Sequence, residues 1–298
     1  MVGEEAVEAA VRAWAPDRFE LGEGLRWTAA GLLGVDILAG RLFALDPEHP
    51  GPARLLAEVD VPLGAVAPVR GSGEVYVAAA GTGVALLTVR EGRAPGVEWL
   101  ARPEDGAPTA MRMNDGCCDP AGRFWAGSMA YDGTPGAGAL YRADPGGAVH
   151  RVLEGYTIPN GPAFSPDGRL MYLADSAEGR IDVFALDGDG EPGPPRVFAR
   201  LTEGSPDGMQ VDDAGHLWTA VWGTGRVHRY TPEGALERVV RLPAAQPASV
   251  CVVGADRPHL FAATARIGLE EAADADGAVF RVPADVPARP AAEFGDAL

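Results

Sequence analysis

The sequence predicts an all-β protein, a six-bladed β-propeller with four strands in each blade. Three observations support this prediction: 40 Gly and 26 Pro are spread along 298 residues, a motif of turn, strand and loop recurs, and its period fits one blade. Because glycine and proline are costly inside helices and strands and useful between them, their abundance indicates many short strands separated by turns. We expect a single propeller domain over residues 1–298.

The repeating unit begins with a turn glycine, continues through an apolar strand and a short glycine-containing loop, and ends with a second strand and a polar turn. It can be read in GLLGVDILAGRLFALDP from Gly31, GEVYVAAAGTGVALLTV from Gly73 and GRLMYLADSAEGRIDVFALD from Gly168. Successive units start about 42 to 49 residues apart, a period that fits propeller blades and is too long for the coils of a β-helix. Six units account for nearly the whole chain.

The N-terminal segment is expected to close the ring. Propellers close when a strand from the start of the chain pairs with the last blade, and residues 19–22 or the segment before them could supply that strand. Alanine is frequent in residues 1–16, which therefore predict a short helical extension outside the ring.

Composition excludes several classes of protein. A formal charge of −17 would repel a phosphate backbone, so we expect no nucleic-acid partner. The start of the chain lacks a basic segment followed by an apolar one, and no run of about 18 apolar residues occurs, so we expect a cytoplasmic protein without a membrane partner. Cys117, Cys118 and Cys251 suggest no disulfide framework. The composition is compatible with a monomer or a dimer.

Polar residues recur at one phase of the repeat. They are Glu23, Asn114, Asn160 and Asp207. Because the innermost strand of every blade lines the channel, residues at the same phase should meet at the same end of it. Oxygen donors without a thiol or imidazole suit one divalent ion, Ca²⁺, Mg²⁺ or Mn²⁺, and are tolerated by Zn²⁺. The competing interpretation is that Asn-Gly and Asp-Gly are ordinary hairpin turns, but the shared phase favours a metal site.

A basic residue accompanies this set. Arg112 stands two residues before Asn114, so both side chains lie on one face of a strand, and the guanidinium could clamp substrate oxygens. The alternative is a structural ion pair of Arg112 with Asp115 or Asp119. The five histidines form no H-x-H or H-E-x-x-H group and the chain has no G-x-S-x-G elbow, which argues against a histidine-ligated zinc site and a serine hydrolase.

These motifs resemble the SMP-30/gluconolactonase/regucalcin family over almost the whole chain. They are E-G-x-x-W from Glu23, R-M-N-D-G from Arg112, D-P-A-G-R-F-W-A-G-S-M from Asp119, I-P-N-G from Ile158 and P-D-G-M from Pro206. The resemblance implies a six-bladed propeller that binds one divalent ion and hydrolyses sugar lactones, aldonolactones such as gluconolactone, to aldonic acids.

The resemblance also implies roles for individual residues. The metal ligands would be Glu23, Asn160 and Asp207, and the substrate contacts Arg112, Asn114 and Asp132. Asp132 is one methylene shorter than the glutamate of the family pattern. The metal would polarise the lactone carbonyl and acidify a bound water, with Asp207 either taking the proton or orienting the nucleophile; the sequence is compatible with both roles.

Two other functions remain compatible with the residues. One is another metal-dependent propeller hydrolase, an acyl-lactonase or an organophosphate hydrolase. The other is a calcium-binding regulator without enzymatic activity. A scaffold needs no aligned carboxylates in its channel, so the set of predicted ligands favours an enzyme.

Overall fold

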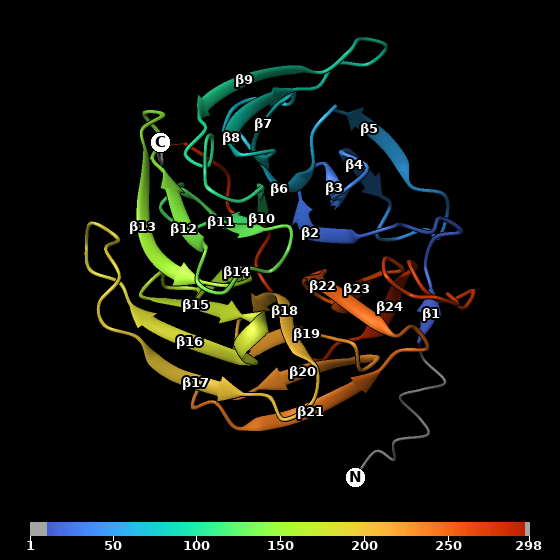
Figure 1. The fold of residues 1–298 in the computed structure, drawn as a ribbon. Coiled ribbons are helices and arrows are strands. Elements are labelled where there is room, and N and C mark those ends of the chain that lie inside the picture. The colour runs from blue at the N-terminus through green and yellow to red at the C-terminus, as the bar shows by residue number, and fades with distance from the viewer. Residues whose placement is uncertain (1–10, 296–298) are drawn as a thin grey trace.

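The computed structural model describes residues 11–295, and within that range the chain forms six four-stranded antiparallel sheets. Figure 1 shows the sheets arranged as blades around a central axis. In the first five blades the strands pair in the order in which they occur in the sequence, and the first strand of each is innermost. The predicted six-bladed β-propeller is confirmed.

The strands of the blades have the following bounds. The first blade has β2 (Gly22–Thr28), β3 (Gly31–Asp36), β4 (Arg41–Leu45) and β5 (Arg54–Glu58), and the second has β6 (Leu63–Pro68), β7 (Val75–Ala80), β8 (Gly83–Thr88) and β9 (Gly96–Ala101). The third has β10 (Met111–Cys118), β11 (Phe124–Ala130), β12 (Gly138–Ala143) and β13 (Val149–Tyr156), and the fourth has β14 (Pro159–Phe164), β15 (Leu170–Asp175), the 3₁₀ turn η1 (Ser176–Glu178), β16 (Arg180–Ala185) and β17 (Arg196–Arg200). The fifth has β18 (Ser205–Val211), β19 (Leu217–Trp222), β20 (Arg226–Tyr230) and β21 (Leu236–Arg241), and the sixth has β22 (Gln246–Val253), β23 (His259–Ala265), β24 (Val279–Pro283) and β1 (Arg12–Ala13).

The sixth blade contains both ends of the propeller and closes the ring. β1 pairs antiparallel with β24, with Ala13 opposite Phe280, so the segment before residues 19–22 supplies the closing strand as expected. The expectation of a helix is wrong for residues 11–16, which contain a strand and no helix. Trp14 is buried there and its indole nitrogen donates to the carbonyl of Asp46 at 2.7 Å, so tertiary contacts override the helix propensity of alanine. Residues 1–10 lie outside the described range.

All six innermost strands carry a β-bulge at the same level. The register with the second strand of the blade shifts between Glu23 and Arg26, between Met113 and Gly116, and likewise in β6, β14, β18 and β22. A bulge bends the strand and changes the direction of its side chains, and bulges are frequent next to functional sites. Each predicted metal ligand therefore lies at the start of a bulge.

The C-terminal segment covers the end of the channel where the innermost strands finish. The amide nitrogen of Ala291 donates to Trp27 at 2.7 Å, Phe294 bridges to Val69, and the amide of Gly295 donates to Gly122 at 3.0 Å. These contacts tie the segment to the first three blades. The predicted site, close to the starts of the innermost strands, lies at the opposite end.

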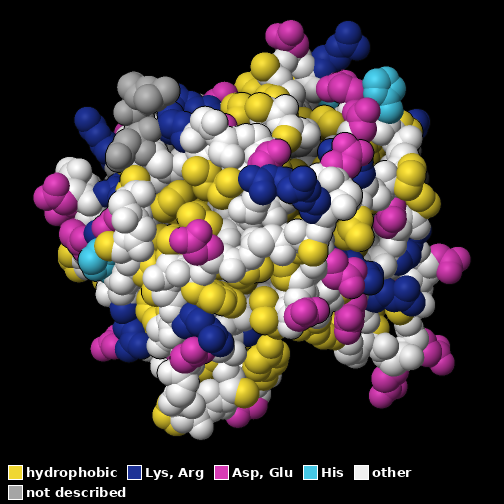
Figure 2. All heavy atoms as spheres, turned by 90° about the horizontal axis from the view of Figure 1, so that it is seen from above, with side chains coloured by type: hydrophobic (Ala, Val, Ile, Leu, Met, Phe, Trp, Pro, Cys, Tyr) yellow, Lys and Arg dark blue, Asp and Glu magenta, His cyan; other side chains and the backbone are white. Residues whose placement is uncertain are grey.

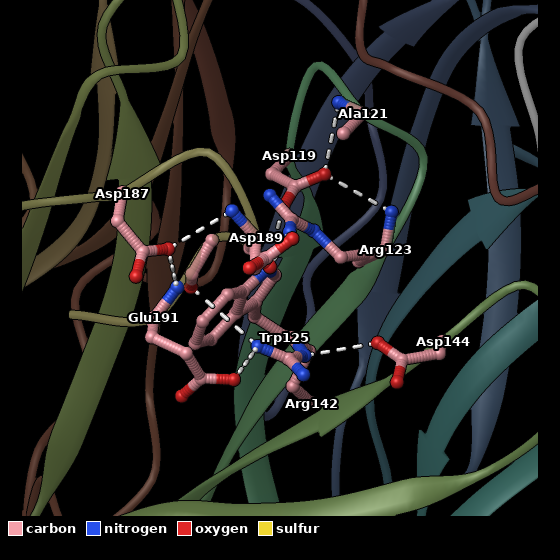
Figure 3. Close-up of polar contacts among 10 residues, drawn as sticks. Asp119, Ala121, Arg123, Trp125, Arg142, Asp144, Asp187, Asp189 and Glu191 are labelled. Atoms are coloured by element: carbon pink, nitrogen blue, oxygen red, sulfur yellow. Dashed lines mark hydrogen bonds and ion pairs between the residues drawn. The ribbon is translucent and has the colours of Figure 1, made fainter.

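An ion pair also joins the third and fourth blades. Arg142 on β12 pairs with Asp144 at 2.9 Å and with Glu191 of the loop between β16 and β17 at 2.7 Å (Figure 3). On the face shown in Figure 2, acidic and basic side chains are interspersed. Within residues 11–295 we find no helix with the length and apolar character needed to span a membrane.

Candidate metal centre

The bulged starts of four innermost strands bring the predicted polar residues together in the channel. The side chains of Glu23, Asn114, Asn160 and Asp207 come from four different blades and are all buried. The amide nitrogen Nδ2 of Asn114 donates to Oδ1 of Asn160 at 2.9 Å. The carboxyl groups of Asp207 and Glu23 lie next to each other. At the same level, the second and sixth blades contribute Gly64 and Ala248, which have no polar side chain.

A chain of hydrogen bonds fixes the orientation of both carboxamides. Arg112 donates from Nη1 to Oδ1 of Asn114 at 2.7 Å, and Asn114 in turn donates to Asn160. Asn160 donates through Nδ2 to the hydroxyl of Ser176 at 2.8 Å, and that hydroxyl donates to the carbonyl of Pro206 at 2.6 Å. Because Nδ2 of Asn160 is engaged as a donor, its carbonyl oxygen Oδ1 is the atom that faces the cluster and could bind a cation.

The glycine after each carboxylate orients it. The amide nitrogen of Gly24 donates to Oε2 of Glu23 at 2.9 Å, and that of Gly208 donates to Oδ1 of Asp207 at 3.0 Å. Each carboxylate is thereby left with a second oxygen for the cluster. A side chain at position 208 would place its Cβ 2.8 Å from the carbonyl oxygen of Ala248, so the bulge requires glycine there.

Ionisation of the two carboxyl groups is unfavourable, because both are buried and lie near further carboxylates. Burial and the nearby charges of Asp207 and Asp115 raise the pKa of Glu23 well above its ordinary value. Burial and the charge of Asp115 raise the pKa of Asp207 to about 8, although the hydrogen bond with Glu23 and the charge of Arg112 act in the opposite direction. A divalent cation between these two groups would stabilise their ionised forms.

The donor set fits a hard divalent ion. Among the described residues there is no group of three or more His, Cys, Asp or Glu side chains that could hold a metal. The candidate set of Glu23, Asn160 and Asp207 is of another kind, because it combines two carboxylates with one carboxamide. Such oxygen ligands suit Ca²⁺, Mg²⁺ and Mn²⁺, with water completing the shell.

Arg112 lies at the cluster and is not part of a structural ion pair. It donates from Nη1 to Asn114 and to the carbonyl of Met113 at 3.0 Å, and Nε and Nη2 have no acceptor among the described residues. The predicted alternative, a pair with Asp115 or Asp119, is wrong, since Asp115 pairs with Arg26 at 2.9 Å and Asp119 with Arg123 at 2.6 Å (Figure 3). Arg112 therefore has donors available for a substrate.

Asp132 lies apart from the cluster. In the turn after β11, its Oδ1 accepts hydrogen bonds from the amide and the hydroxyl of Thr134, at 3.0 and 2.6 Å, and its Oδ2 accepts from Thr109 at 3.4 Å. These bonds lower the pKa of the exposed Asp132 carboxyl. A short Asp side chain readily folds back onto its own turn in this way. The structure does not bring Asp132 into contact with Arg112 or Asn114.

Sequence reasoning missed one charged pair in the channel. Arg26 and Asp115 are both buried, and they meet across the channel between non-adjacent blades. Both residues belong to sequence motifs, Arg26 to E-G-x-x-W and Asp115 to R-M-N-D-G, but the sequence does not give the width of the channel, on which their contact depends.

Beyond Arg26, toward the C-terminal segment, lies a cavity of about 170 Å³. Its walls are mostly apolar and include Trp27, Met209 and Val250, with Cys117 among them. None of the predicted metal ligands or substrate contacts lines this cavity. Because an apolar cavity offers no set of ligands for a cation, we place the chemistry at the other end of the channel.

Comparisons with known proteins show which family and which fold the chain is similar to. Residues 21–266 match the family model described as SMP-30/Gluconolactonase/LRE-like region. A 6-deoxy-6-sulfogluconolactonase from Pseudomonas putida is 36% identical over 279 residues, covering 90% of this chain and 92% of that protein. An L-arabinolactonase from Azospirillum brasilense is 35% identical over 277 residues, covering 88% and 86%. Among solved structures, a calcium-binding protein, regucalcin, from Agrobacterium tumefaciens has a TM-score of 0.85 and 28% identity, covering 97% of this chain and 98% of that one.

Proposed function

The chain belongs to the SMP-30/gluconolactonase/LRE-like family, and we propose that it is a metal-dependent lactonase that opens sugar lactones at the channel cluster. The observation that carries the proposal is the pair of buried carboxyl groups of Glu23 and Asp207, whose two negative charges one divalent ion would balance. Relatives named as lactonases of two different sugars support the substrate class.

Three residues would hold the ion: Glu23 and Asp207 through one carboxylate oxygen each, and Asn160 through Oδ1. When bound, a divalent cation would supply Lewis-acid chemistry, polarising a carbonyl and lowering the pKa of water. The name of the regucalcin relative supports a calcium-binding site, and the oxygen ligands also suit Mg²⁺ and Mn²⁺ and are tolerated by Zn²⁺.

The side chains of this protein would share the remaining work. Arg112 directs Nε and Nη2 to the oxygens of the lactone and offsets the negative charge that develops as the carbonyl carbon becomes tetrahedral. Asp207 would bind the ion through Oδ2, and its Oδ1, which accepts from the amide of Gly208, has a second lone pair that would accept the proton of the attacking water. Asn114 accepts from Arg112 and donates both N–H groups of its amide, to Asn160 and to the carbonyl of Pro159, so it keeps these groups in place. Its Oδ1 has a second lone pair that would accept a hydrogen bond from a substrate hydroxyl.

Asp132 belongs to this proposal as a residue of the pocket rim. Its carboxylate is exposed in the turn after β11, where rotation away from Thr134 would allow it to accept a hydrogen bond from a sugar hydroxyl. We further propose that the chain works as one propeller domain in the cytoplasm. The free thiols of its three cysteines support a reducing compartment.

A substrate panel tests the proposed function. The chelated protein is assayed with a pH indicator against sugar lactones, acyl lactones and phosphotriesters, each with Ca²⁺, Mg²⁺, Mn²⁺ or Zn²⁺ added. We expect metal-restored turnover of five- or six-membered aldonolactones. A preference for acyl lactones or phosphotriesters would assign the site to another hydrolase class, and no turnover of any substrate would indicate a binding role.

A further inference from the structure

A buried ion pair crosses the channel beside the candidate metal centre. Arg26 donates from Nη2 to Oδ1 of Asp115 at 2.9 Å and to the carbonyl of Gly116 at 2.8 Å. Asp115 is fully buried and Arg26 is 7% exposed. Arg26 comes from β2 in the first blade and Asp115 from β10 in the third, so the pair spans the width of the second blade.

The second blade leaves room for this crossing. Its residue at the bulge is Gly64, and a Cβ there would lie 2.1 Å from the carbonyl oxygen of Asn114. The backbone of β6 can therefore approach β10 closely, which shortens the distance that the Arg26 side chain has to span.

The carboxylate of Asp115 joins three of the strands that build the centre. Besides Arg26, its Oδ1 accepts from the amide of Gly116 at 2.8 Å, and its Oδ2 accepts from the amide of Gly161 at 3.2 Å. Gly161 directly follows the predicted ligand Asn160 on β14. The same carboxylate thus fixes the bulges of β2, β10 and β14, which carry Glu23, Asn114 and Asn160.

Stability alone does not account for a third carboxylate at this place. Burial of an ion pair is often no more favourable than burial of apolar side chains of similar volume. The charge of Asp115 moreover lies close enough to disfavour ionisation of both Glu23 and Asp207. What the pair does supply is a fixed geometry between blades that are not neighbours.

We propose that Arg26 and Asp115 are positioning residues of the metal centre, which hold Glu23 and Asn160 at the distance from each other that one divalent ion requires. This inference rests on the proposed function, because it assumes that the cluster binds a metal. Outer-shell residues that orient metal ligands contribute to affinity without touching the ion.

Calorimetric titration of the chelated full-length protein with Mn²⁺ tests the inference. Arg26→Met removes the charge and the hydrogen bonds while keeping an unbranched side chain of similar volume, and we expect Mn²⁺ affinity to fall about 10- to 100-fold. Asp115→Asn should have an effect of similar size, and the double variant should be no worse than either single variant, because both belong to one contact. Arg26→Lys, which keeps the charge, should recover part of the affinity.

The matched control is Arg229→Met. Arg229 pairs with the fully buried Asp212 at 2.7 Å, but both lie within the fifth blade and neither contacts the cluster. We expect this variant to lower the melting temperature in chelator and to leave the Kd for Mn²⁺ unchanged. Melting in chelator thus separates loss of stability from loss of metal affinity.

In Arg26→Met, loss of the fixed geometry and loss of the positive charge change Mn²⁺ affinity in opposite directions, so the measured affinity distinguishes a positioning role from an electrostatic one. Loss of a positive charge near the site would by itself tighten cation binding, so tighter binding by Arg26→Met would show an electrostatic role and overturn the positioning role. Unchanged affinity in a folded variant would overturn it too. Should Arg26→Met not fold, Arg26→Gln, which removes the same positive charge, provides the same comparison. Absence of Mn²⁺ binding by the wild-type protein would instead refute the proposed metal centre.

Discussion

Replacing Asp207 with asparagine should make the metal-free protein more stable while it abolishes metal binding. Burial and the charge of Asp115 raise the pKa of this carboxyl from 3.8 to about 8. Between these two pH values the folded chain keeps a proton that the unfolded chain has lost. The free energy of unfolding therefore falls as pH rises through this window, by about 1.4 kcal/mol per pH unit for this group.

The size of the effect follows from the same shift. About pH 7 lies roughly three pH units above 3.8, the ordinary pKa of the carboxyl, so burial of Asp207 lowers the free energy of unfolding by about 4 kcal/mol at this pH. Asparagine is neutral and keeps an oxygen for the amide of Gly208, so Asp207→Asn should recover part of it, about 1–3 kcal/mol after relaxation of the surroundings. In chelator we expect the melting temperature to rise by roughly 2–5 °C.

Thermal melts in chelator and in excess metal give the readout. The gain should shrink as pH falls toward 3.8 and vanish below it, where the carboxyl of the wild type is protonated in both the folded and the unfolded chain. In excess Mn²⁺ the order should reverse, because only the wild type is stabilised by the ion. Asp212→Asn is the control, since it leaves Arg229 without its buried partner and should destabilise under both conditions. If Asp207→Asn melted below the wild type in chelator at about pH 8, the reasoning about charge at the centre would be refuted.

Three further outcomes are expected. Glu23→Gln should lower Mn²⁺ affinity at least about tenfold by removing one of the two charged ligands, and calorimetry showing wild-type affinity would exclude Glu23 from the ligand set. Arg112→Ala should lower kcat/KM by an amount that corresponds to a loss of roughly 2–4 kcal/mol of transition-state stabilisation. Elemental analysis should find the metal content unchanged, and loss of the metal would assign Arg112 another role. Because the pKa values of Asp207 and Glu23 are both raised, that of Asp207 to about 8, Mn²⁺ must displace protons at lower pH, so its affinity should increase by about tenfold or more per pH unit below about pH 8. Affinity that does not vary with pH would contradict that pKa.

The repeat was sufficient to predict the blades and the convergence of the cluster. A propeller places equal phases of its repeats at equal heights, so Glu23, Asn114, Asn160 and Asp207 could be brought together from their spacing alone. Because the innermost strands carry a bulge at the same place, residues at the same position of the repeat lie at the same height in the channel. The roles of these residues as ligands, and the single domain over the whole chain, remain predictions.

Other features depend on contacts that spacing does not encode. The ion pair of Arg26 with Asp115 depends on the distance between non-adjacent blades, and the fold of Asp132 onto Thr134 is decided within one turn. The N-terminal segment forms a strand because pairing with β24 and burial of Trp14 outweigh its local helix propensity. In each case a tertiary contact decides between local alternatives.

Metal titration of catalysis tests the central claim most directly. The chelated protein is mixed with a saturating aldonolactone, and the rate of proton release is followed as Mn²⁺ is added in steps, beside Asp207→Asn under the same conditions. The account predicts that activity rises until one ion is bound per chain, while the variant stays at the uncatalysed rate. Full activity in the presence of chelator, or metal-restored activity in Asp207→Asn, would contradict it.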